Sequence, residues 1–137
     1  MKKLVATLFA RVVVGSTTFG LYVGTAQSRP QYFKAFKEKY VKPDGSAEEK
    51  AFAAEVTDAK CLVCHEAGSK KNRNSYGKEL AKVFIPPNEK DPAKIDEAFS
   101  KVADMHVDPN DPNSPTYGDL IKQGKLPGGE AKAGQNK

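Results

Sequence analysis

The feature that most constrains this chain is the sequence Cys61-Leu-Val-Cys64-His65, in which two cysteines stand three positions apart and a histidine follows directly. This C-x-x-C-H spacing is typical of c-type haem attachment, because the two thiols can form thioethers with the two vinyl groups of one porphyrin. His65 would then lie under the iron as its proximal ligand. The chain has only these two cysteines, which excludes a four-cysteine zinc site. The sequence therefore predicts one covalently bound haem c.

Residues 1–26 have the organisation of a secretory signal peptide. A short basic start and an apolar stretch precede small residues at the −3 and −1 positions of a cleavage site before Gln27. Residues 4–26 are also long enough to span a bilayer, so an uncleaved membrane anchor is the alternative. Covalent haem attachment in bacteria takes place outside the cytoplasmic membrane. We therefore expect the rest of the chain in the periplasm or an equivalent exported compartment.

The charge of the chain gives no support to a nucleic-acid-binding function. Cleavage before Gln27 would remove three of the 22 basic residues and none of the 17 acidic ones, so the formal net charge would fall from +5 to +2. No motif of interleaved basic and aromatic residues is present either. The exported part is long enough for one small domain with a thin hydrophobic core. We expect a mono-haem domain over residues 27–129, followed by a flexible polar tail over 130–137.

The exported part is organised as short helices separated by turns rich in proline and glycine. Apolar residues at helical spacing and helix-start signals predict five helical segments, over residues 31–42, from Ser46 to the haem motif, 75–84, 92–105 and 116–124. Residues 66–74 and 107–115 are expected to be loops, and no strand hairpin is predicted. The predicted class is all-α, a compact cytochrome c-like domain of four to five short helices around one covalently bound haem.

The sixth iron ligand decides what such a haem can do, and the sequence offers two equal candidates. Met105 is the only methionine of the exported part, and a Met/His pair is usual in cytochromes c. His106 continues the apolar helical stripe of Ile95, Phe99 and Val102. A lysine would first have to lose its proton to coordinate the iron. An open sixth position would instead bind oxygen, nitric oxide, carbon monoxide or peroxide.

Basic residues gather in the sequence around the haem motif, whereas acidic residues gather after the fourth predicted helix. The basic group is Lys60, Lys70, Lys71, Arg73, Lys78 and Lys82. The acidic group is Asp104, Asp108, Asp111 and Asp119. This asymmetry would orient an exposed haem edge toward an acidic redox partner and would make their encounter salt-dependent. An ordinary solvated surface explains the same pattern.

Three segments resemble small exported bacterial mono-haem c-type cytochromes: 60–65, 71–77 and 116–127. The similarity covers about residues 50–128. It implies electron transfer between redox partner proteins, without catalytic turnover of a substrate. Some members form heterodimers in which a cysteine coordinates the iron. Here Cys61 and Cys64 would both be bound to the porphyrin, so this chain has no thiolate left for that role, while pairing as a homodimer or heterodimer stays open.

Two other functions compete with electron transfer. A haem protein with an open sixth position would bind or sense small ligands, and carbon monoxide binding to the reduced protein would reveal it. A thiol-redox protein would use C-x-x-C directly, but it needs a preceding strand and a following helix that the sequence does not indicate. Detection of covalent haem by mass spectrometry would exclude the thiol-redox function.

Overall fold

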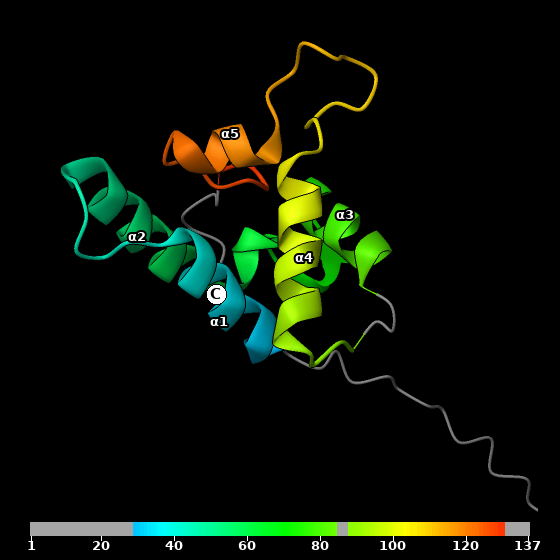
Figure 1. Cartoon of the computed structure of the whole chain (residues 1–137), viewed down its shortest axis with the longest axis horizontal. Coiled ribbons are helices and arrows are strands. Elements are labelled where there is room, and N and C mark those ends of the chain that lie inside the picture. The colour runs from blue at the N-terminus through cyan, green and yellow to red at the C-terminus, as the bar shows by residue number, and fades with distance from the viewer. Residues whose placement is uncertain (1–28, 85–87, 131–137) are drawn as a thin grey trace, which may run out of the picture.

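The computed structural model describes residues 29–84 and 88–130 and shows a mainly helical domain with one small sheet (Figure 1). The elements are α1 (Pro30–Tyr40), α2 (Ala47–Ala59), the 3-10 helix η1 (Lys60–Val63), β1 (His65–Glu66), β2 (Ser69–Arg73), α3 (Ser75–Val83), α4 (Pro92–Ala103) and α5 (Tyr117–Lys122). The predicted signal segment 1–26 and nearly all of the predicted tail lie outside the described residues. Within the described part, no helix is long and apolar enough to cross a membrane.

Helix α4 is the centre of the domain, and α1, α3 and α5 all contact it. The core is rich in aromatic rings, and Phe36 and Phe99 are almost completely buried at its middle. Their rings lie 6.0 Å apart, nearly perpendicular to each other, in the edge-to-face geometry that aromatic pairs prefer. The predicted stripe of Ile95, Phe99 and Val102 is confirmed as part of the core, which also contains Phe52, Val56, Tyr76, Leu80 and Phe84.

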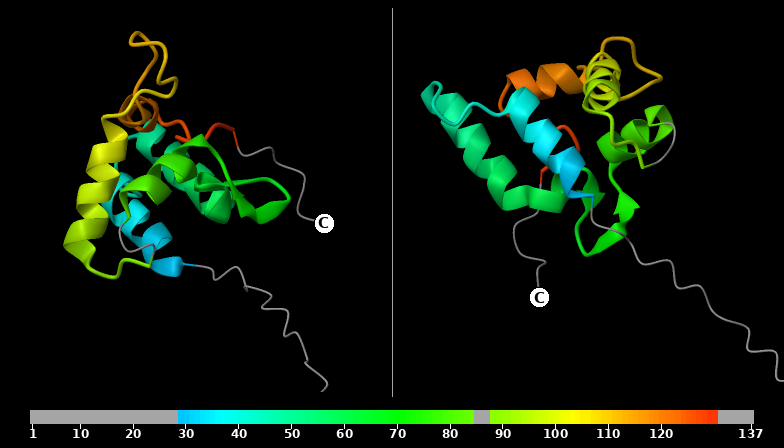
Figure 2. Two further views of the ribbon diagram at one scale, coloured as in Figure 1. Left: turned by 90° about the vertical axis from the view of Figure 1, so that its right-hand side faces the viewer. Right: turned by 60° about the horizontal axis from the view of Figure 1, so that its bottom comes forward.

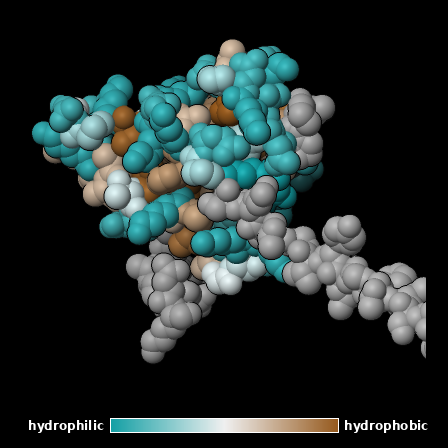
Figure 3. Space-filling view, turned by 90° about the horizontal axis from the view of Figure 1, so that it is seen from below, coloured by the Kyte–Doolittle hydropathy of each residue, from teal (hydrophilic) through white to brown (hydrophobic). Residues whose placement is uncertain are grey.

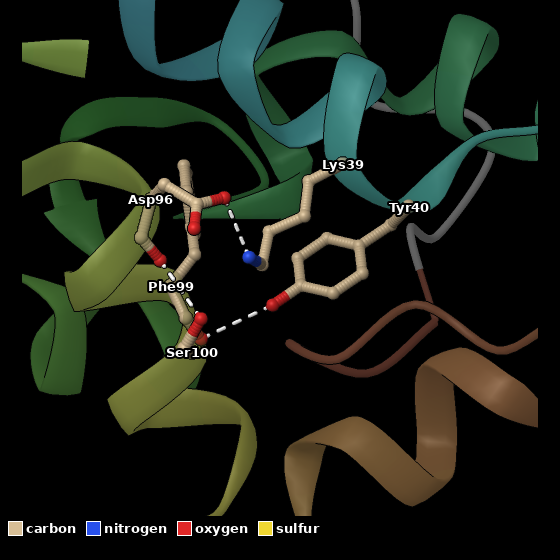
Figure 4. Close-up of polar contacts among 5 residues, drawn as sticks. All are labelled: Lys39, Tyr40, Asp96, Phe99 and Ser100. Carbon is tan, nitrogen blue, oxygen red and sulfur yellow. Dashed lines mark hydrogen bonds and ion pairs between the residues drawn. The ribbon is translucent and has the colours of Figure 1, made fainter. Parts of the chain in front are cut away.

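Polar contacts fix α1 across α4 in addition to the aromatic packing (Figure 4). The hydroxyl of Tyr40 donates a hydrogen bond to the carbonyl oxygen of Phe99 at 3.1 Å. Lys39 forms an ion pair with Asp96 at the edge of the same contact. Burial is the main reason that the pKa of Tyr40 rises to about 12, so this phenol stays a hydrogen-bond donor at neutral pH.

Three of the helix starts follow the local signals in the sequence. Ser46 and Glu49 form a complete capping box at the start of α2, and Thr116 and Asp119 form another at the start of α5. Asp91 caps α4, which has proline at its first position. These predictions are confirmed because each depends on residues within three positions of the helix start.

The expectation that residues 66–74 form a loop is wrong, because residues 66–73 belong to a hairpin. Strands β1 and β2 pair antiparallel, with His65 opposite Arg73 and Glu66 opposite Ser69, and a bulge interrupts the pairing. Gly68 makes the tight turn with a φ of +85°. This hairpin could not be predicted from the sequence, because almost all of its side chains are exposed and polar. The hairpin therefore lacks the alternation of apolar and polar residues that indicates a strand.

The fourth helix ends earlier than predicted, at Ala103 with Asp104 as its C-cap. Met105 and His106 therefore lie beyond the helix, and His106 forms an isolated antiparallel bridge with Thr116. The helical-spacing argument that favoured His106 fails for this reason. The wider prediction of a mainly helical domain is confirmed, whereas the prediction that it contains no strand pair is wrong.

Candidate haem-attachment site

The two cysteines lie on a single tight turn that follows α2. The N–H of Cys64 donates a hydrogen bond to the carbonyl oxygen of Cys61 at 3.2 Å, which closes the turn around residues 62 and 63. Both thiols are free and partly buried. Lys60 begins the turn with a φ of 50° and a ψ of −111°, a left-handed conformation that favours glycine. The backbone therefore leaves the α-helical conformation of α2 at Lys60, directly before the first cysteine.

The side chain of His65 is held by the hairpin in one defined tautomer. Its Nδ1–H donates to the carbonyl oxygen of Asn72 at 3.1 Å, and since a carbonyl can only accept, the lone pair is left on Nε2. Burial is the main reason that the pKa of His65 lies below its ordinary value, and the positive charge of Arg73 adds to this effect. A neutral imidazole with one nitrogen fixed by a backbone carbonyl is the usual state of a metal-ligating histidine.

The thiol of Cys64 is not activated for redox chemistry. Burial raises its pKa to about 12, and the neighbouring Cys61 contributes in the same direction. Reactive C-x-x-C cysteines have the opposite property, a lowered pKa, because they lie at a helix N-terminus or beside a cation. Here the motif follows the C-terminal end of α2 instead. The Cys64 thiol therefore stays protonated at neutral pH, on the same tight turn as Cys61.

One buried side chain, Asn74, ties the motif to the rest of the domain. Its amide nitrogen donates to the carbonyl oxygens of Leu62 and Val63, at 3.0 and 3.1 Å. Its amide oxygen accepts from the N–H of Gly77 at 2.9 Å and so caps α3. Its own backbone N–H donates to the carbonyl oxygen of Cys64 at 3.2 Å. A single residue therefore satisfies three consecutive carbonyl groups of the turn.

Two glycines allow these contacts, and we call Asn74, Gly77 and Gly128 the Asn74 clasp. A Cβ atom at Gly77 would overlap the carbonyl oxygen of Cys64, and one at Gly128 would overlap the side chain of Asn74. Gly128 belongs to the segment after α5, so the clasp joins the haem motif to the C-terminal end of the described chain. Glycine is required at both positions because a neighbouring group comes too close for a Cβ atom. Neither position has a positive φ.

Sequence reasoning assigned no role to any residue of the clasp. Asn74 and Gly77 stand in the segment 71–77 that carries the resemblance, and Gly128 directly follows the segment 116–127. The one local signal was Asn74 itself, because asparagine is a favoured N-cap and the following residues continue as a helix. The contact with Gly128 has no local signal.

The two candidates for the sixth ligand lie in a different part of the molecule. Met105 is 39% exposed, and His106 is exposed, with its Nδ1 hydrogen-bonded to the carbonyl oxygen of Ser114. Both views in Figure 2 show the β1–β2 hairpin and the loop after α4 at different ends of the domain. The structure therefore brings Cys61, Cys64 and His65 together and does not bring Met105 or His106 to them.

The described turn offers two free thiols and apolar surface, which are the groups that a covalently attached haem would require. No group of three or more His, Cys, Asp or Glu side chains gathers as a metal site in the part of the chain that the structure describes. Leu62 and Cys64 are only partly buried and pack against the core, so the turn presents apolar surface. Other apolar patches lie between hydrophilic side chains on the face seen in Figure 3. A porphyrin plate needs such surface to lie against.

Comparison with known proteins identifies no relative of this chain. No family model matches it, and it matches neither a curated protein nor a solved structure. The argument for function therefore depends on the residues and geometry of the site.

Proposed function

We propose that this protein is an exported mono-haem c-type cytochrome that carries single electrons between redox partner proteins. The observation that carries the proposal is the geometry of the C-x-x-C-H turn, in which two free thiols precede a histidine whose Nε2 is available. When bound, the haem would supply a one-electron iron couple. No substrate is turned over in this role, so the protein would not be an enzyme.

Each residue of the turn has a distinct task in this proposal. Cys61 and Cys64 would hold the porphyrin through thioethers, and His65 would bind the iron from the proximal side. The hydrogen bond from His65 to Asn72 would orient the imidazole ring and increase its basicity. The Asn74 clasp would keep the backbone of the turn in one conformation before and after attachment.

The thiol-redox alternative has less support from the same site. Burial raises the pKa of Cys64 to about 12, so Cys64 would not supply the thiolate nucleophile that this function requires. The function also requires the motif at the start of an α-helix, whereas the cysteines follow α2. The position of the motif after α2 therefore favours thiols that are consumed in haem attachment.

A second candidate function, binding or sensing of a small ligand such as nitric oxide, carbon monoxide, oxygen or peroxide, is favoured by the position of Met105 and His106. An electron carrier with a filled coordination shell needs one of them, or another ligand, to reach the iron. Met105 and His106 belong to the loop that follows α4, and both views in Figure 2 show this loop away from the hairpin. Carbon monoxide distinguishes the two functions, because it binds reduced haem rapidly only where the sixth position is open or weakly held.

The partner of the proposed carrier would be an acidic redox protein in the exported compartment. Lys70, Lys71 and Arg73 are all exposed on strand β2, next to His65 on its partner strand. A positive surface beside the attachment site would raise the encounter rate with an acidic partner at low salt. We expect electron exchange with such a partner to slow as the ionic strength rises. A rate of electron exchange that does not change with salt would contradict an acidic partner.

A dimer with a second cytochrome is compatible with the proposed electron-carrier function.

The proposal is tested by producing the full chain together with haem-attachment machinery and recording its absorption spectrum. A Soret band and the sharp α-band of reduced haem c are expected, and carbon monoxide should leave the reduced spectrum of an electron carrier unchanged. A spectrum that changes on carbon monoxide addition would support the ligand-binding function. A protein that exports well and contains no haem would contradict both functions.

A further inference from the structure

Three basic side chains of the β1–β2 hairpin have no acidic partner within the described part of the domain. Lys70, Lys71 and Arg73 are all exposed on β2, and none of the ion pairs between described residues includes them. The one carboxylate of the hairpin, Glu66, is paired with Lys78 instead. We call Lys70, Lys71 and Arg73 the basic hairpin surface. Its three positive charges are therefore not neutralised by a neighbouring carboxylate.

The loop after α4 carries the opposite charge, and its charges are also unpaired. Asp104, Asp108 and Asp111 are exposed, and residues 104–113 contain no lysine or arginine. The ion pairs between described residues include none of these three carboxylates, which we call the acidic loop surface. Met105 lies in the same segment and is the one large hydrophobic side chain that the described residues expose. The loop thus combines negative charge with exposed apolar surface.

The two surfaces cannot neutralise each other within one molecule. Both views in Figure 2 show the hairpin and the loop after α4 away from each other. Each surface is therefore available to a different neighbouring molecule. A contact between two unlike surfaces of the same chain is heterologous, so it leaves one unused surface on each outer copy and further copies can add.

We propose that this protein associates head to tail with further copies of itself, with the basic hairpin surface of one copy on the acidic loop surface of the next. Three charges of each sign meet in this contact, and Met105 would lose exposed apolar area. Exposed ion pairs are weak and are screened by salt, so we expect a transient association that is strongest at low ionic strength.

Self-association would also affect the docking of a redox partner. Arg73 lies opposite His65 in the hairpin, so a neighbouring copy on the basic hairpin surface would cover the surface beside the attachment site. The bound copy and an acidic redox partner would therefore compete for the same charges. This consequence rests on the proposed function, whereas the association itself is measured independently of electron transfer.

The first test is sedimentation equilibrium of the haem-loaded full chain at two salt concentrations. At about 0.01 M salt, charges act over roughly 30 Å, whereas at about 1 M salt they act over roughly 3 Å. The weight-average mass should rise with protein concentration at the low salt concentration and should equal the mass of one copy at the high one. A mass of one copy at every protein concentration in low salt would overturn the inference.

Two double variants test which surfaces meet. Lys70→Gln/Lys71→Gln removes two charges from the basic hairpin surface. Asp108→Asn/Asp111→Asn removes two charges from the acidic loop surface, and asparagine keeps the side-chain oxygens that accept backbone N–H groups in this loop. Each variant alone should sediment as one copy. An equimolar mixture should form dimers and nothing larger, because each variant retains the surface that the other lacks.

The matched control changes the net charge equally at another place. Lys34→Gln/Lys101→Gln removes two exposed lysines that are paired along their own helices, and this variant should associate like the unmodified protein. Undiminished association of either surface variant alone, or a mixture that sediments as single copies, would overturn the inference and leave haem attachment intact. Absence of haem from the unmodified protein would instead overturn the proposed function, and the same sedimentation measurements would still decide the association.

Discussion

The haem motif and the segment that carries Met105 and His106 are built in opposite ways. The motif is held by hydrogen bonds from Asn74, whose side chain in turn packs against Gly128 near the C-terminal end of the described chain. The segment after α4 is held mainly by itself: Ser114 bonds both His106 and Asp108 within the same loop. One region is rigid through the tertiary structure, and the other is a local surface loop.

This difference indicates which half of a haem site the fold itself prepares. The proximal half has both thiols, an oriented imidazole and a backbone with all three carbonyl groups of residues 62–64 satisfied. The loop with Met105 and His106 is joined to the start of α5 by the bridge between His106 and Thr116, and both of its candidate side chains are exposed. In the proposed cytochrome the attachment site would therefore be preformed, whereas a sixth ligand would have to come from a rearranged loop or from an external molecule.

The largest effect is expected from Gly77→Ala. The new Cβ atom would overlap the carbonyl oxygen of Cys64, so the variant should lose about 3 kcal/mol of folding free energy and most of its attached haem. Gly118→Ala is the control in the other region, because its Cβ would meet the Ala103 carbonyl oxygen at 2.9 Å and cost about 1 kcal/mol. Chemical denaturation and haem absorbance measure both. Equal losses would show that the motif is not held more tightly than the α4–α5 contact.

Asn74→Asp should have the next largest effect. The substitution keeps the oxygen that caps α3 but removes the amide donors to Leu62 and Val63, which leaves two carbonyl groups of the turn without that partner. We expect a loss of about 2 kcal/mol, measured by denaturation. Asn113→Asp makes the same chemical change on an exposed loop residue and should stay within about 0.5 kcal/mol of the original protein. If Asn74→Asp leaves the free energy of unfolding unchanged, the Asn74 clasp does not stabilise the turn.

Lys60→Gly should stabilise the protein by about 1 kcal/mol, because Lys60 has a positive φ that glycine adopts without strain. The matched variant Lys71→Gly changes the same residue type on the exposed strand β2, where glycine weakens a strand and should be destabilising. The thermal midpoint measures both. If Lys60→Gly proves as destabilising as Lys71→Gly, the turn does not impose the left-handed conformation.

The imidazole of His65 should lose its proton at lower pH than an ordinary histidine, because burial and the nearby charge of Arg73 both lower its pKa. NMR titration of this imidazole in the full chain before haem attachment should therefore give a midpoint below the ordinary histidine pKa of about 6.5. Arg73→Gln removes a nearby cation and should move this midpoint slightly upward. A midpoint at the ordinary value would contradict the buried environment.

The smallest effects on stability are expected from Met105→Ala and His106→Ala, within about 0.5 kcal/mol, because both side chains are exposed. The absorption spectra of the two haem-loaded variants distinguish an electron carrier from a ligand-binding protein. In an electron carrier that recruits this loop, one of the two variants becomes high-spin while the other keeps its spectrum. Two unchanged spectra would show that neither residue reaches the iron and would favour the ligand-binding function.

The sequence predicts the local parts of this fold well and the long-range parts poorly. The capping boxes at Ser46 and Thr116 and the buried stripe of α4 depend on residues a few positions apart, which a sequence displays directly. The motif itself is also local. The hairpin was missed because its strands are polar on both faces, and its turn depends on Gly68. The clasp was missed because Asn74 and Gly128 meet only through the tertiary fold.

The central claim, that the turn at residues 61–65 is a haem-attachment site, is tested most directly by peptide mass spectrometry. The protein is isolated from cells that contain haem-attachment machinery, treated with a thiol alkylating reagent and digested. The account predicts that the peptide with Cys61 and Cys64 carries the mass of one haem and no alkyl group. Two alkylated thiols, or a disulfide between the two cysteines, would contradict it.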